Sequence, residues 1–451
     1  MSHEDRPEDD VLDPVRFNPR SMFSRGQPVW ANACVGDNGL NELPQYAAGY
    51  AQAADLIIAA VLASHRGQVD VLVYPACFCI RHAVELHLKN TIGQLLSLPV
   101  ANRFERVVVQ EFWRSHDLGA MWELLTVKMA TLDSRLTPEL QKIDGLVREC
   151  AEIDRNGQVF RYPHSKKNDR HLVAQRLINF VSLHRGWVLL KEGLDIIFRL
   201  VETLKDEYSR CTFTAKLSRH QLCLISSLLP PRGEWGSAKF QETKLNIMMS
   251  FQLSGREFSK ALKIIEAHRE FAPRIGIEIP LIGFDEDVWR WLVKAWLYQY
   301  PERAKDYQEG SGADSHSDKV DEDDEIDESN LFSRRREIWV GAREKVSAEF
   351  LAALNALFYY AFHPDYSEDF DLAFQQQLPL KQRDERLGED EMSRSFFHVF
   401  GKTNLIHNLA RSLCALGKIN WVLSLHREIE LSACESAIAW YDEREARRKT
   451  G

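Results

Sequence analysis

One stretch decides the fold class of this chain: Arg81-His82-Ala83-Val84-Glu85-Leu86-His87-Leu88-Lys89. It lies within a longer segment, 69–97, whose apolar residues recur at three- and four-residue spacing and predict one long helix. Its expected core stripe consists of Leu72, Ala76, Cys79, Ala83, Leu86 and Asn90. Pro75 falls in the first turns and is expected to be a first helical residue or a kink.

The charged residues of this stretch have a simple structural interpretation. Arg81, Glu85 and Lys89 follow one another at four-residue spacing and can form a ladder of ion pairs, each worth about 0.3–0.5 kcal/mol. The helix would then have a solvated charged edge. Arg81 and His87 lie about 120° apart on an ideal helix, so they share a face only if the helix is distorted or long side chains reach around it.

Further helical patterns surround this segment. They run over 43–64, from Asp117, from Thr137 to about Asn156, and over 172–208. Ser115 or Asp117 is expected to cap the third helix, and Thr137 the fourth with Pro138 as its first residue. Residues 159–164 should be extended because of Pro163. Five helices with short connections predict a bundle over 43–210, after an irregular arm at 1–42.

The central stretch resembles the second bundle helix of the HEPN superfamily, whose members often show an Arg-His-Ala-hydrophobic-Glu-Leu-x-Leu-Lys segment. The resemblance covers about residues 43–208 and includes Ser115-His116-Asp117-Leu118 and Phe160-Arg161-Tyr162-Pro163. Many HEPN proteins are ribonucleases of toxin–antitoxin, anti-phage or RNA-surveillance systems. The resemblance therefore implies a metal-independent endoribonuclease of a bacterial defence or stress system. Arg81 would bind the scissile phosphate, and His87 would be the acid or base at a homodimer interface, with His82 next to Arg81 as the third candidate catalytic residue.

Non-catalytic interpretations stand beside this one. Short motifs of this kind also arise by chance, so the Arg81 segment need not be catalytic. The chain could instead be a HEPN-like scaffold that dimerises through the bundle and binds a partner protein through its C-terminal helices. Asp117 could orient His116 for general-base catalysis, but an acid at a helix start is more often a cap.

One loop of the bundle half is concentrated in basic residues and is a candidate RNA-binding site. The candidates are Arg155, Arg161, His164, Lys166, Lys167 and Arg170. A solvated loop without a ligand is the simpler interpretation of the same residues.

The second half, 211–451, is expected to form a mainly helical domain, so the fold class is all-α. Ser254 to Glu257 is a capping box, and helical patterns follow at 285–298, 335–360, 403–416 and 423–448. Residues 308–330 hold ten acidic residues and one lysine, which accounts for the whole formal charge of −9. This insertion should be disordered. It could bind a partner protein, mimic nucleic acid or block a basic site.

Composition excludes several other classes. At 451 residues the chain should hold two or three domains. Its N-terminus has no apolar signal region, and we found no continuous apolar run long enough to span a membrane, so a cytoplasmic protein is expected. The eight cysteines are scattered and should be reduced. Cys77-Phe78-Cys79 lacks a second ligand pair, so no metal or cofactor is expected.

Overall fold

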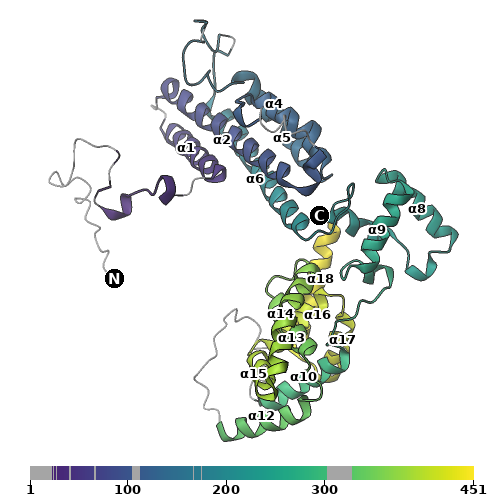
Figure 1. The fold of residues 1–451 in the computed structure, drawn as a ribbon. Helices are drawn as coiled ribbons and strands as arrows, with labels where there is room; N and C mark the ends of the chain where they lie inside the picture. Colours follow the sequence, from purple (N-terminus) through teal and green to yellow (C-terminus); the bar gives the residue numbers. More distant parts are fainter. Residues whose placement is uncertain are drawn as a thin grey trace. The chain divides into compact units, whose positions relative to one another are not determined.

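The computed structural model describes residues 23, 25–26, 28–39, 42–64, 68–103, 112–165, 167–173, 175–301 and 328–450 (Figure 1). Helices dominate this part of the chain, and its only β-structure is two isolated bridges, His164 with Arg170 and Leu281 with Phe284. The predicted all-α class is confirmed. Two compact units meet at the bond between Ser209 and Arg210.

The first unit is a bundle around α2 (Val69–Ser97), which follows α1 (Leu43–Ala63) in an antiparallel pair (Figure 1). The predicted bounds of α2 are confirmed. Pro75 lies inside the helix rather than at its first position, on the exposed side. From Ala76 onward α2 is buried on almost every face, because α1, α4 and α6 all pack against it. The predicted solvated edge is therefore wrong: Arg81 and Glu85 are 3% and 2% exposed.

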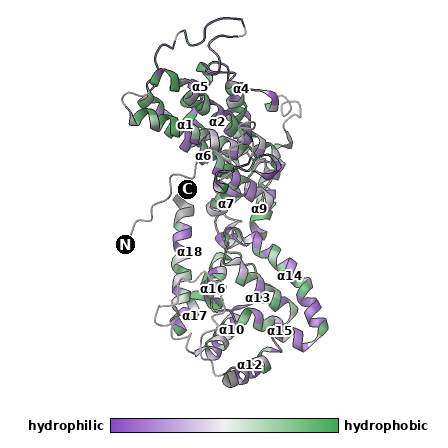
Figure 2. Ribbon diagram, turned by 90° about the vertical axis from the view of Figure 1, so that its left-hand side faces the viewer, coloured by the Kyte–Doolittle hydropathy of each residue, from purple (hydrophilic) through white to green (hydrophobic). Residues whose placement is uncertain are grey.

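Helix α1 is apolar, and the rest of the bundle covers only part of it. An 18-residue window within it has a mean hydropathy of 1.4 and is 28% buried, so by length and composition α1 could cross a membrane, as core helices of soluble proteins also could. Figure 2 shows its predominantly hydrophobic colouring. Its one charged residue, Asp55, accepts hydrogen bonds from Trp187 Nε1 at 2.7 Å and Lys191 Nζ at 2.6 Å. These bonds tie α1 to α6 (Phe180–Ser209) within the bundle.

The next two helices begin for different reasons. Asp117 caps α4 (Leu118–Glu123) by accepting from the Ala120 amide at 3.0 Å, as predicted. Helix α4 then continues as a π-helical turn. Helix α5 (Leu136–Ile153) starts one residue before Thr137, so the predicted Thr137 cap is wrong. Its start is instead fixed by Arg135, which pairs with Asp133 and Glu207.

Helix α6 begins eight residues later than the pattern from Leu172 predicts. Residues 175–179 form a strap without regular secondary structure instead, and the Asn179 side chain accepts from the amides of Val181 and Ser182 to start the helix. The predicted extended piece at 159–164 forms turns and one isolated bridge residue. Helical spacing alone therefore does not distinguish the strap from a further turn of helix.

The second unit begins with three helices, α7 (Arg219–Leu228), α8 (Ala238–Ser250) and α9 (Gly255–Ala267). Capping boxes start α7 and α9, the latter at Ser254 and Glu257 as predicted. The remaining helices are α10 (Glu286–Gln299), α12 (Glu328–Ala342), α13 (Ala348–Tyr360), α14 (Ser367–Leu387), α15 (Glu389–Phe400), α16 (Leu405–Ala415), α17 (Ile419–Ile429) and α18 (Ser432–Thr450).

The helices of this unit differ in part from the predicted ones. The segments 335–360 and 423–448 each contain two helices, and α14 and α15 were not predicted. Of the acidic insertion, 308–327 lie outside the described residues, and 328–330 form the start of α12. Trp289, Trp296 and Phe358 are fully buried in the hydrophobic core of this unit.

A buried ion cluster joins α7 to α14 in this unit. Arg219 pairs with Glu270 and, at 2.8 Å, with Glu368, and His268 lies 2.9 Å from the same Glu368 carboxylate. The Thr212 hydroxyl donates to that carboxylate at 2.7 Å. Burial would raise the pKa of Glu368, but hydrogen bonds from His268 and Arg219 outweigh burial and hold it well below its usual range. The cluster is a cross-link between helices distant in sequence.

Candidate functional site

Arg81 locks α2 to two loops of the bundle. Its guanidinium pairs with Glu85 and donates to the carbonyl oxygens of Asp154 and Arg155, both at 3.2 Å, and of His116. Asp154 follows the last turn of α5, where carbonyl groups lack helical partners. All three guanidinium nitrogens therefore have protein acceptors, so Arg81 could bind a phosphate only by giving some of them up.

Glu85 is the centre of the charge network around Arg81. Besides Arg81, Lys89 Nζ and His116 Nδ1 each lie 2.8 Å from Glu85 Oε1. Burial would raise the pKa of Glu85, but hydrogen bonds from Lys89, Arg81 and His116 outweigh it and lower the pKa to about 2. A carboxylate that is ionised at neutral pH thus lies at Nδ1 of His116, whose side chain is 65% exposed.

His82 approaches the other oxygen of the same carboxylate. Its Nδ1 lies 4.0 Å from Glu85 Oε2. The ring stacks on Phe78 at 5.6 Å between centroids and meets the edge of Tyr50 at 4.4 Å. Burial lowers the pKa of His82, against the attraction of Glu85, so the ring is neutral at neutral pH. Two imidazoles in different environments therefore share one buried carboxylate at the edge of the bundle.

His87 has different surroundings from Arg81. It is partly buried, and burial lowers its pKa while the charge of Asp195 on α6 raises it. Arg81 instead contacts the loops that flank α4 and α5. Within one chain, Arg81 and His87 thus face different neighbours, as the 120° separation predicts.

The predicted RNA-binding residues are mostly exposed, and some of them are already partnered. Arg155 Nε donates to Asp117 Oδ2 at 2.6 Å, which leaves Asp117 a cap and ion-pair partner rather than the residue that orients His116. The Arg161 guanidinium lies over the rings of Phe78 and Tyr162, at 5.7 and 5.5 Å.

The other loop candidates extend this basic surface. His164 pairs with Arg170 in an isolated bridge, and both are exposed together with Lys167. Lys166 lies outside the described residues. The aromatic residues next to Arg161 thus connect the loop to His82, a link that the sequence does not reveal.

A hollow of about 410 Å³ adjoins His82. It lies between arm residues 34–36 and α1, and Tyr46 and Tyr50 line it. Since Tyr50 also touches His82, the hollow and the histidine share one side chain. Sequence reasoning missed the contact of Tyr50 with His82 and the pairing of His116 with Glu85, because these partners lie tens of residues apart along the chain.

Metal chemistry has no anchor in the described part of the chain. No group of three His, Cys, Asp or Glu side chains there could hold a metal ion. Burial raises the pKa of the Cys77 thiol to about 12, so this cysteine is not a thiolate ligand at neutral pH. The arrangement at Glu85 suits proton transfer instead, since it offers two histidines in unlike environments.

Comparison with family models, with curated proteins and with solved structures gives no match for this chain.

Proposed function

We propose that this protein cleaves RNA without a metal ion, using His82 and His116 as its acid–base pair. The observation that carries the proposal is that both imidazoles lie at the oxygens of one buried carboxylate, Glu85, on an edge open to solvent. General acid–base catalysis needs one imidazole that can accept a proton and one that can give one. Unlike environments around paired titratable groups provide this division.

The roles follow from the surroundings of each ring. Neutral His82 accepts the proton of a ribose 2′-hydroxyl, whose oxygen attacks the neighbouring phosphorus. His116, held through Nδ1 by Glu85, presents Nε2 to solvent and in its doubly protonated form gives a proton to the departing 5′-oxygen. The products are a 2′,3′-cyclic phosphate and a 5′-hydroxyl end. Exposed Arg161, which lies over the Phe78 ring that stacks on His82, is the candidate to bind the phosphate charge.

The aromatic surroundings favour single-stranded RNA. Tyr46 and Tyr50 line a hollow that can take an unstacked base, and Tyr162 extends the surface on the other side of Arg161. Stacking of bases on such side chains is worth about 1–3 kcal/mol each and requires no particular sequence. Duplex RNA, whose bases are already stacked, should be a poor substrate.

The test is a cleavage assay in EDTA with single-stranded RNA and the full chain. His82→Ala and His116→Ala should each lower the rate by about 10²–10⁴-fold. His184→Ala, an exposed histidine of α6, is the matched control and should not change it. A 2′-deoxy substitution at the cut site should abolish cleavage there.

Two outcomes would contradict this assignment. If His87→Ala abolishes cleavage while His82→Ala and His116→Ala do not, the acid–base residue is the one that the HEPN resemblance implies. If the purified protein cleaves no RNA, the catalytic proposal is wrong altogether.

A non-catalytic scaffold is the second candidate, and the covering of α1 favours it. Tyr46, Leu56 and Leu62 of α1 are exposed, which leaves an apolar face uncovered in the single chain. Contiguous exposed apolar surface of this kind is typical of interaction sites. A homodimer through α1 predicts a doubled mass in light scattering, which Leu56→Glu should reduce to the monomer mass.

A further inference from the structure

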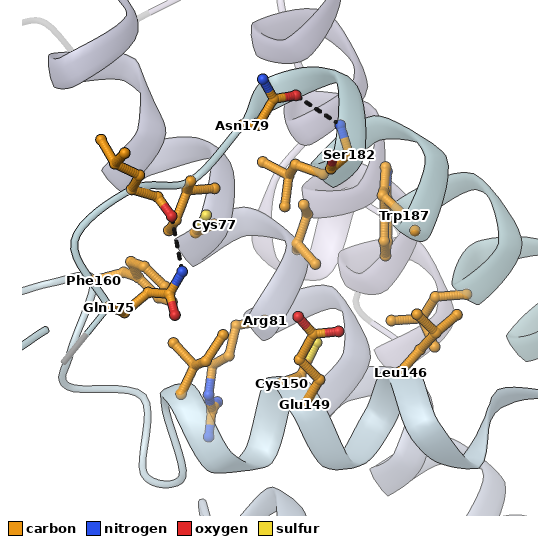
Figure 3. A pocket seen from close by; sticks show the side chains of 17 residues that line it. Cys77, Arg81, Leu146, Glu149, Cys150, Phe160, Gln175, Asn179, Ser182 and Trp187 are labelled. Atoms are coloured by element: carbon orange, nitrogen blue, oxygen red, sulfur yellow. Dashed lines mark hydrogen bonds between the residues drawn. The ribbon is translucent and has the colours of Figure 1, made fainter.

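A cavity of about 500 Å³ lies between α2, α5 and α6 (Figure 3). Its walls are mostly apolar and include Ile80, Leu146, Phe160, Trp187 and Leu190. Protein interiors seldom leave gaps much larger than a water molecule. A volume of this size with a few polar groups is instead typical of a small-molecule site.

The strap over this cavity supports the same interpretation. Residues 175–179 have no regular secondary structure, and Leu177 lines the cavity although it is 86% exposed. A leucine in that position has apolar surface to bury, and a ligand beneath the strap would give it a partner.

The charge of the lining restricts the ligand. Glu149 is the one carboxylate among the lining residues, and Figure 3 shows it beside Cys150, pointing from α5 toward the space between the helices. The one cationic side chain of the lining, Arg81, is already paired with Glu85. A cationic group therefore suits the mouth of this cavity better than an anionic one.

We propose that the cavity binds a small apolar molecule that carries an amine. Its apolar part would lie against Leu146, Trp187 and Leu190, and its ammonium group would pair with Glu149. This site is separate from the proposed RNA-cleaving edge and does not depend on that activity.

Three probes with one tail test the proposal: n-octylamine, 1-octanol and octanoate, each added to the full chain below its micelle concentration. Binding would be measured by calorimetry and by the emission of Trp187, with Trp187→Phe identifying that signal. We expect saturable binding in the order amine, alcohol, carboxylate. Glu149→Gln should weaken the amine by about two- to fivefold, the size of an exposed ion pair, and leave the alcohol unchanged.

A filled cavity provides the second arm. A side chain at Gly186 would first meet Leu146 Cδ2 at 3.7 Å from its Cβ, an ordinary contact, so Gly186→Leu should fill the cavity without disrupting the fold. Gly145→Leu, in open space on the surface of α5, is the matched control. Loss of binding in the first variant alone supports the site. Absence of saturable binding by all three probes, equal binding by Gly186→Leu, or octanoate binding most tightly would each overturn the proposal.

Discussion

Two buried ion clusters hold the two units of this chain, and they differ in one respect. In the first unit, Arg81 and Glu85 are buried but the His116 ring that completes the cluster is largely exposed. In the second unit, Arg219, Glu270 and His268 are all buried. The same residue types thus form an open cluster in one unit and a closed one in the other.

The difference distinguishes a cluster that only stabilises the fold from one that could also exchange protons with a substrate. A buried charge that is fully paired stabilises the contacts between helices, whatever its sequence motif suggests. Only a titratable ring that also reaches solvent can exchange protons with a substrate. By this criterion Arg81 is structural, while His116 and His82 are candidates for catalysis.

Arg81→Ala and Arg219→Ala should each lower the free energy of unfolding of their own unit by about 3–5 kcal/mol, because each leaves a buried carboxylate without its main partner. Hydrogen exchange during urea titration measures the two units separately. Arg155→Ala, which breaks only an exposed pair with Asp117, is the control and should cost about 0.2–1 kcal/mol. If Arg81→Ala and Arg155→Ala lower the free energy of unfolding equally, the buried Arg81–Glu85 pair does not stabilise the unit more than an exposed pair does.

Glu85→Gln should remove a pH-dependent part of the stability of the first unit. Because the pKa of Glu85 is lowered to about 2 in the fold, its contribution of about 3 kcal/mol is complete above its ordinary pKa of 4.5. It is lost as the pH falls from 4.5 toward 2. The difference in unfolding free energy between wild type and Glu85→Gln should therefore shrink over that window. A difference that stays constant would show that Glu85 is not ionised through these contacts.

His268→Ala should lower the stability of the second unit by about 1–3 kcal/mol, since it removes a buried ring that contacts the Glu368 carboxylate and stacks on Phe271. RNA cleavage should not change. His116→Ala should have the opposite profile, with a loss of cleavage and a cost in stability below about 1 kcal/mol for its exposed ring. If both histidines affect stability alone, the open cluster has no catalytic role.

Gly157→Ala should cost about 1–2 kcal/mol, because residue 157 has φ of +72° and a Cβ there would lie 3.1 Å from the Arg81 guanidinium carbon. The control is Gly145→Ala in exposed α5, which should stabilise the protein by about 0.5–1 kcal/mol. Thermal unfolding of the two variants compares the signs directly. A stabilising Gly157→Ala would show that the Arg81 side chain moves aside freely.

The sequence predicted the bounds of helices better than it predicted which residues pack against them. The bounds of α2 were predictable because its apolar residues keep helical spacing over 69–97. The strap at 175–179 was not, since it has the same spacing but leaves Leu177 exposed. The pairing of Arg81 with Glu85 follows from local spacing, whereas the burial of both depends on packing against other helices.

The site was predictable only in part for the same reason. His82 and the basic loop are visible in the sequence as candidates. The partnership of His116 with Glu85 joins residues 31 positions apart, and no local pattern specifies it. Asp117 was correctly predicted as a cap from its position at a helix start.

The hydrogen bonds of Arg81 also bear on how this protein can change over generations. Three of its acceptors are carbonyl oxygens, at His116, Asp154 and Arg155, and a carbonyl is present whatever side chain the residue carries. Substitutions at those three positions would keep the hydrogen bonds of Arg81, whereas substitutions at positions 81, 85 and 157 would lower the stability of the first unit. Homologues could therefore keep this architecture with little more in common here than an arginine, a glutamate and a glycine.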